Sequence, residues 1–179
     1  MSLVDIVNES DEIVEQADFE EIHSKGLRHR SVQLFVFQYP DYRDKSKLLV
    51  AQRSGNQETS ALKLHPSVGG HVMAGQSYGE AVIAELREEL FHDKSELPRG
   101  FVFHEIAKYK NDTRTKNKEN TRLFITEYSG PFSPDPKEIE RVFWQDPNEV
   151  WEDMKSNPEK YTNSFKNAMR EYMFSLHGD

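Results

Sequence analysis

The chain has no cysteine among its 179 residues, which excludes disulfide bonds, thiolate nucleophiles and cysteine-ligated zinc. It has no hydrophobic run approaching the roughly 18 residues of a membrane span. The N-terminus is acidic, unlike a signal peptide. It also lacks an excess of positive charge, because 23 basic and 31 acidic residues give a formal net charge of −8. We therefore expect a cytoplasmic protein that binds neither membranes nor a nucleic acid polymer.

Length and composition predict one folded domain that spans residues 1–179. The chain is long enough to bury a core, and 30% charged residues fit a soluble protein with a polar surface. Residues 1–28 are interpreted as an N-terminal extension. Within it, residues 11–26 fit either an amphipathic helix or an extended lead-in.

Stretches rich in β-branched and aromatic residues predict strands at residues 31–39, 47–53, 100–110, 120–130 and 141–146. Residues 54–67 are polar and read as irregular, and the C-terminal segment 147–176 reads as one or two helices. Strands on both sides of a central helix, closed by terminal helices, predict an α+β sandwich.

The central helix follows a glycine-rich turn at residues 69–75. Val82, Leu86 and Leu90 recur every four residues and make one apolar stripe. Ser77 is a suitable N-cap, and Glu80 three residues later completes a capping-box pattern.

Three glutamates, Glu85, Glu88 and Glu89, share a face of this helix because they lie three and four residues apart. Carboxylate oxygens suit Mg²⁺, which can neutralise a diphosphate and activate a water. The spacing alone also fits an ordinary solvated acidic face.

Residues 69–91 resemble the Nudix box, in which a glycine precedes a helix carrying Arg-Glu-apolar-any-Glu-Glu-any-Gly. Gly70 matches the first glycine and Glu85–Glu89 match the core of the motif. The resemblance implies a Nudix fold, an α/β/α sandwich around a mixed sheet, with residues 69–91 as the loop and helix of the box. It also implies hydrolysis of a diphosphate linkage in a nucleoside diphosphate derivative or related small molecule, with Mg²⁺ or Mn²⁺ on Glu85, Glu88 and Glu89.

The motif departs from the family pattern at three positions. Gln76 replaces a glutamate, Ala84 replaces an arginine and Phe91 replaces a glycine. These departures favour an alternative in which the chain is a catalytically weak or inactive Nudix-fold module that binds a ligand or partner.

Further segments within residues 20–155 resemble the isopentenyl-diphosphate isomerase-like branch of the family. That resemblance implies metal or substrate roles for His23, His29 and His71, with Glu119 as another metal ligand. Thr121 stands where the branch has a second glutamate. Gly69 stands where true isomerases have a cysteine, and without that proton-transfer group the isomerase reaction is the less favoured reading.

Two residues outside the box complete the predicted site. Glu138 precedes a strand where many Nudix hydrolases carry another glutamate, so it is either a general base or metal ligand, or an exposed loop acid. Arg53 matches an arginine that contacts diphosphate in the isomerases, or else it makes a structural salt bridge. We expect Arg53, Gly70 and His71 to bind substrate.

Overall fold

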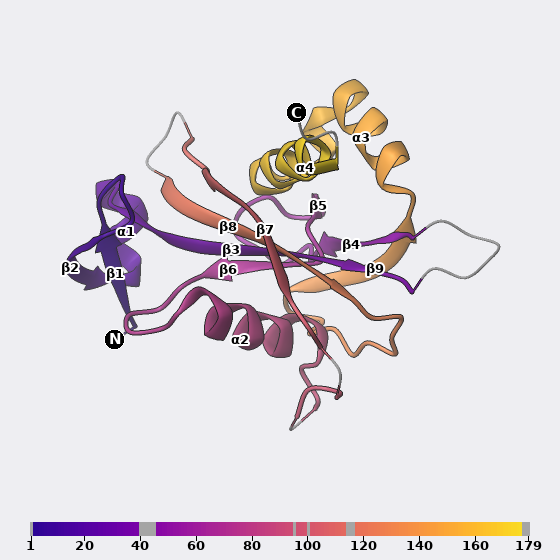
Figure 1. Ribbon diagram of the computed structural model, residues 1–179, viewed down its shortest axis with the longest axis horizontal. Coiled ribbons are helices and arrows are strands. Elements are labelled where there is room, and N and C mark those ends of the chain that lie inside the picture. The colour runs from indigo at the N-terminus through magenta and orange to yellow at the C-terminus, as the bar shows by residue number, and fades with distance from the viewer. Residues whose placement is uncertain (1, 40–45, 95, 100, 114–116, 177–179) are drawn as a thin grey trace.

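The computed structural model describes residues 2–39, 46–94, 96–99, 101–113 and 117–176 (Figure 1). The strands are β1 (Leu3–Val7), β2 (Ile13–Asp18), β3 (Arg28–Phe37), β4 (Leu48–Arg53), β5 (Leu64–His65), β6 (Val68–His71), β7 (His104–Lys110), β8 (Lys118–Glu127) and β9 (Ile139–Gln145). The helices are α1 (Phe19–Lys25), α2 (Tyr78–Leu90), α3 (Pro147–Ser156), the 3-10 turn η1 (Pro158–Lys160) and α4 (Asn163–Leu176).

Strand β3 organises a mixed sheet. It pairs in parallel with β8 along its whole length, from Arg28 opposite Lys118 to Phe37 opposite Glu127. Its other side pairs antiparallel with β6, and β7 continues the sheet beyond β8. Strand β4 meets the end of β3 and carries β9 and β5. The predicted strands therefore exist, although β7 begins only at His104, and residues 64–65 form a short strand where an irregular segment was expected.

Helices cover both faces of this sheet (Figure 1). Alternate residues of β3 point to opposite faces, so Leu34 packs in the core beneath α2 with Leu86. Phe35 packs on the other face against Phe165 of α4. The two cores confirm the α+β fold with helices on either side of a mixed sheet.

The N-terminal extension is folded onto the sheet. Residues 11–26, for which helix and extended chain were both open, contain strand β2 followed by helix α1. Strand β1 pairs with β2 and touches β3 where Ile6 lies opposite His29. This arrangement brings α1 close to the start of β3 and thereby positions His23.

Local contacts define the first residue of helix α2, and the helix ends at Phe91. The Ser77 side chain accepts the Glu80 N–H, and the Glu80 carboxylate accepts the Ser77 N–H at 2.8 Å, so the predicted capping box is confirmed. The helix ends at Phe91 without a left-handed residue. Within the described part of the chain, no helix is long and apolar enough to cross a membrane.

Candidate active site

A cavity of about 770 Å³ lies where β3, β6, α2 and the start of α4 meet. It brings together most of the residues predicted from the sequence. Those that line it are Arg53, Gly70, His23, His71, Glu85, Glu89, Glu119 and Glu138. His29 and Glu88 do not line the cavity but adjoin residues that do.

Two glutamates of α2 face the glycine-rich strand β6. A Cβ at position 70 would coincide with the Glu85 carboxylate, so only glycine leaves room for that carboxylate. The Gly69 N–H donates to Glu89 Oε2 at 3.3 Å, and Glu89 is 6% exposed. Strand β6 thus holds the two carboxylates at one wall of the cavity.

Burial, and then the proximity of other acids, raises the pKa values of both glutamates. Burial first, and then the charges of Glu88 and Glu138, raise the pKa of Glu85 to about 7. Burial, Glu85 and Glu138 raise the pKa of Glu89 well above its ordinary value. A cation bound between the carboxylates would stabilise their charged forms.

Arg53 and Glu138 meet at the rim, where β4 ends and β9 begins. The Ser54 N–H donates to the Glu138 backbone oxygen at 2.8 Å, and this bond fixes the approach of Glu138 to the cavity. Partial burial and the nearby charges of Asp135 and Glu88 raise the Glu138 pKa. Arg53 donates through Nη2 to Gln57 at 2.7 Å, whereas its buried Nε finds no protein acceptor among the described residues.

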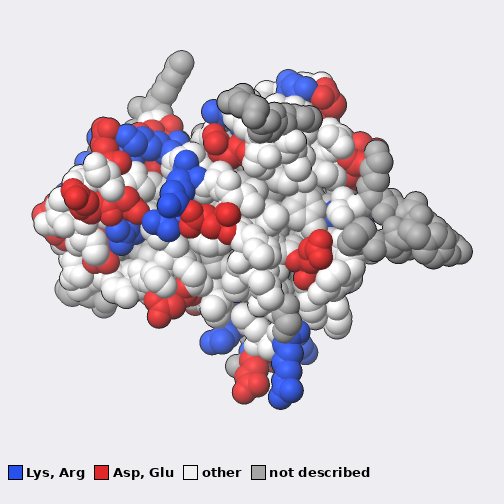
Figure 2. Space-filling model, in the orientation of Figure 1, with Lys and Arg blue, Asp and Glu red and all other residues white. Residues whose placement is uncertain are grey.

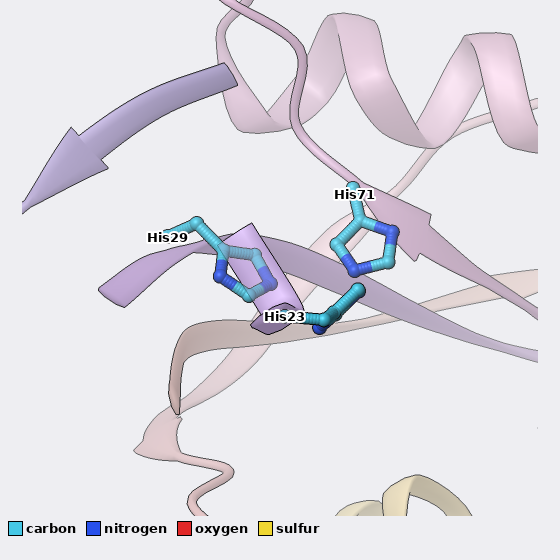
Figure 3. Close-up of side chains that lie close together, drawn as sticks. All are labelled: His23, His29 and His71. Carbon is cyan, nitrogen blue, oxygen red and sulfur yellow. The ribbon is translucent and has the colours of Figure 1, made fainter. Parts of the chain in front are cut away.

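Three histidines lie close together (Figure 3), and two of them, His23 and His71, line the cavity. His23 comes from α1, His29 from β3 and His71 from the end of β6, and their ligand atoms lie within 4.8 Å of one another. Glu119 of β8 approaches them, with Oε1 3.7 Å from His29 Nε2 and 3.9 Å from His71 Nε2.

Hydrogen bonds fix the Glu119 carboxylate in this cluster. It accepts from Ser31 at 3.1 Å, from Asn117 at 2.7 Å and from Asn111 at 2.5 Å. Burial acts to raise its pKa, but His29, His71 and Asn117 outweigh burial and lower it to about 2. Glu119 is therefore a charged carboxylate at neutral pH.

The donor set of this cluster fits a divalent metal ion. His29 Nδ1 lies 2.9 Å from the Leu27 carbonyl, which leaves Nε2 as the free lone pair. Both His29 Nε2 and His71 Nε2 are buried without a hydrogen-bond partner in the described structure. Burial, opposed by Glu119 and aided by the other histidines, lowers the His71 pKa to about 4, so His71 is neutral and able to ligate.

Comparison with known proteins identifies the family. The model of the NUDIX domain family matches residues 27–166. The chain belongs to the Nudix family.

Individual relatives agree with this assignment. An uncharacterized Nudix hydrolase of Nostoc sp. is 31% identical over 155 residues, which are 85% of both chains. The isopentenyl-diphosphate Delta-isomerase of Cereibacter sphaeroides is 24% identical over 172 residues, and the aligned region covers 88% of this chain and 86% of the isomerase. The fold resembles a crystal structure from Deinococcus radiodurans, with a TM-score of 0.74 and 22% identity over 94% and 97% of the two chains.

Two of the three departures from the Nudix box, Gln76 and Phe91, have structural explanations, whereas nothing in the structure explains Ala84. Gln76 accepts the Met73 N–H at 3.0 Å in the turn before α2 and does not line the cavity. Phe91 is buried in an aromatic cluster with Phe101, Tyr128 and Phe132. Gln76 therefore supports the turn, and Phe91 belongs to the hydrophobic core.

Helical spacing grouped Glu88 with Glu85 and Glu89, but the structure separates them. Glu88 is exposed and lies outside the cavity lining, although its charge still acts on Glu85 and Glu138. Several residues that line the cavity were not predicted from the sequence, among them Gln33 and Asn111. Gln33 could have been found from strand alternation, since it follows the predicted His29 and then Ser31 on one face of β3.

Proposed function

We propose that the chain is a hydrolase that depends on a divalent metal ion and cleaves a diphosphate bond in a nucleoside diphosphate derivative or related small molecule. The observation that carries this proposal is a pair of carboxylates, the half-buried Glu85 and the buried Glu89, beside Gly70 in a cavity rimmed by Arg53. When both carboxylates are charged they repel each other, and a bound cation would stabilise their charged forms.

Glu85 and Glu89 would hold Mg²⁺ or Mn²⁺, with Glu88 and Glu138 close enough to add ligands or charge. The ion supplies charge neutralisation of the diphosphate and a more acidic water. Arg53 at the rim binds a phosphate oxygen through its unpartnered Nε. Glu138, whose pKa is raised, accepts the proton of the water that attacks phosphorus.

The histidine cluster would hold a second divalent ion through His23, His29, His71 and Glu119. Imidazole and carboxylate together suit Mn²⁺ or Zn²⁺ better than Mg²⁺. His71 follows Gly70 directly, so a metal ion held there would adjoin the diphosphate site and would help to orient the substrate.

A small cavity on an acidic chain favours a small-molecule substrate over a polymer. Lysine and arginine are interspersed with acidic side chains on the face that Figure 2 shows. The net charge of −8 adds no attraction for a polyanion.

Phosphate release from a panel of nucleoside and prenyl diphosphates tests the proposal, with Mg²⁺ or with chelator. Glu89→Gln keeps the side-chain shape but loses the charge, and should lower kcat on the order of 100-fold or more. Glu149→Gln, on the exposed first turn of α3, is the matched control and should keep full activity.

The panel also separates the alternatives. Ligand binding without turnover by wild type would support a Nudix-fold binding module instead. Interconversion of isopentenyl and dimethylallyl diphosphates, followed by NMR, would support the isomerase reaction.

A further inference from the structure

Gln33 is a buried polar residue that the diphosphate chemistry does not use. It lies in the middle of β3, is 4% exposed and lines the active-site cavity. Its Oε1 atom is buried and has no hydrogen-bond partner among the described residues. A buried acceptor left unpaired costs about 1–3 kcal/mol, so its position in a ligand cavity calls for a partner from the ligand.

The neighbouring strand is shaped around this carboxamide. Gly69 lies opposite Gln33 in the β3–β6 pairing. A Cβ at position 69 would lie 2.6 Å from Gln33 Oε1 and 2.9 Å from both Cδ and Nε2. Because real Cβ atoms do not approach so closely, any larger residue at position 69 would displace the carboxamide.

One part of the cavity wall carries uncharged hydrogen-bonding groups. Phe35 lies two residues after Gln33, on the same face of β3, and packs on Phe165 in the first turn of α4. The residues just before that ring, Thr162, Asn163 and Ser164, line the same cavity as Gln33. This wall therefore offers hydroxyl and amide groups.

Aromatic surface for stacking a nucleobase is scarce in the cavity. Among the described lining residues, Phe19 is the one phenylalanine, tyrosine or tryptophan. Its ring already makes edge contacts with His23 and His71, at centroid distances of 6.0 and 5.1 Å. The organic part of a ligand therefore meets polar groups near Gln33.

We infer that Gln33 selects diphosphates whose organic group carries hydroxyls, such as a polyol or sugar diphosphate. This inference rests on the proposed function, since it assumes that the diphosphate lies against Glu85 and Glu89. A ligand hydroxyl satisfies the Gln33 carboxamide, whereas an alkyl chain leaves it unpaired in a dry site. Discrimination is strong when the wrong ligand leaves a buried polar group without a partner.

The test compares ribitol 5-diphosphate with pentyl diphosphate, which share the diphosphate and a five-carbon chain. Affinity is measured by calorimetry with Mg²⁺, and phosphate release is followed separately. Wild type should bind ribitol 5-diphosphate about tenfold or more tightly, as expected for one buried hydrogen bond. Gln33→Leu should remove most of that preference, whereas Gln16→Leu on the exposed edge strand β2 should keep it.

Gly69→Ala provides a second perturbation that leaves Gln33 itself intact. Its Cβ would push the carboxamide away, so the same loss of preference is expected. Gly79→Ala is the matched control, because a Cβ there would meet no atom of the described residues within 4 Å.

Equal affinity for the two diphosphates in wild type, or an unchanged preference in both Gln33→Leu and Gly69→Ala, would overturn the inference. A preference that depends on Gln33 without any phosphate release would support it while refuting hydrolysis. Hydrolysis of both compounds with no binding preference would leave the proposed function standing and remove this inference.

Discussion

Replacing Gly70 by alanine places a Cβ where the Glu85 carboxylate now lies. Ordinary van der Waals contact begins near 3.4 Å, so the carboxylate must move by more than about 1 Å or the strand must shift. A misplacement of about 1 Å in a catalytic constellation can lower the rate on the order of 100-fold. We therefore expect Gly70→Ala to lower kcat/KM for diphosphate hydrolysis by about that factor.

Steady-state phosphate release at saturating Mg²⁺ measures this effect, and urea unfolding checks that the variant is folded. Gly79→Ala, on the same helix as Glu85, should keep activity and gain about 0.5–1 kcal/mol from helix propensity. The double variant Gly70→Ala/Glu85→Asp should recover part of the lost activity, since aspartate is one methylene shorter. Wild-type kcat/KM in folded Gly70→Ala would refute the argument that Gly70 makes room for Glu85.

Three further predictions address charge, metal and core. Because the Glu85 pKa is raised to about 7, first by burial, its charged fraction falls below that pH. The calorimetric affinity for Mg²⁺ should therefore drop about tenfold from pH 8 to pH 6; a flat profile would contradict this. His29→Phe should abolish Mn²⁺ binding at the histidine cluster in EPR titrations, and unchanged stoichiometry would reject that centre. Phe91→Gly restores the family residue but removes a buried ring, so urea unfolding should show a loss of about 3–5 kcal/mol, and a loss below about 1 kcal/mol would count against this packing argument.

The elements around α2 could be predicted because their signals are local. The Ser77 and Glu80 cap and the stripe of Val82, Leu86 and Leu90 all lie within one segment of chain. Spacing could not distinguish Glu88 from Glu89, since both suit a face shared with Glu85. The position of α2 against β6 places Glu89, but not Glu88, in the cavity lining, and that position depends on long-range packing.

The histidine cluster shows the opposite case, in which residue types were suggested by resemblance but their meeting depends on topology. His29 and His71 are brought together because β3 pairs with β6, with Ser31 opposite His71. His23 depends on α1, within a segment for which the sequence left helix and extended chain open. No periodicity within a short window encodes those pairings.

Three consecutive residues of strand β6 have three separate roles. Gly69 makes room for the Gln33 carboxamide, Gly70 makes room for Glu85, and His71 joins the histidine cluster. Successive residues of a strand face opposite sides of the sheet, so a change at one position leaves the surroundings of the next almost untouched. If the proposed roles hold, a descendant of this chain could change its preference for the organic group through residue 69 alone, while it keeps the diphosphate and metal roles proposed for residues 70 and 71. An insertion or deletion in β6 would instead move each of these three residues to the opposite face of the sheet and disrupt all three roles at once. New specificities should therefore arise here by substitution and not by a change in length.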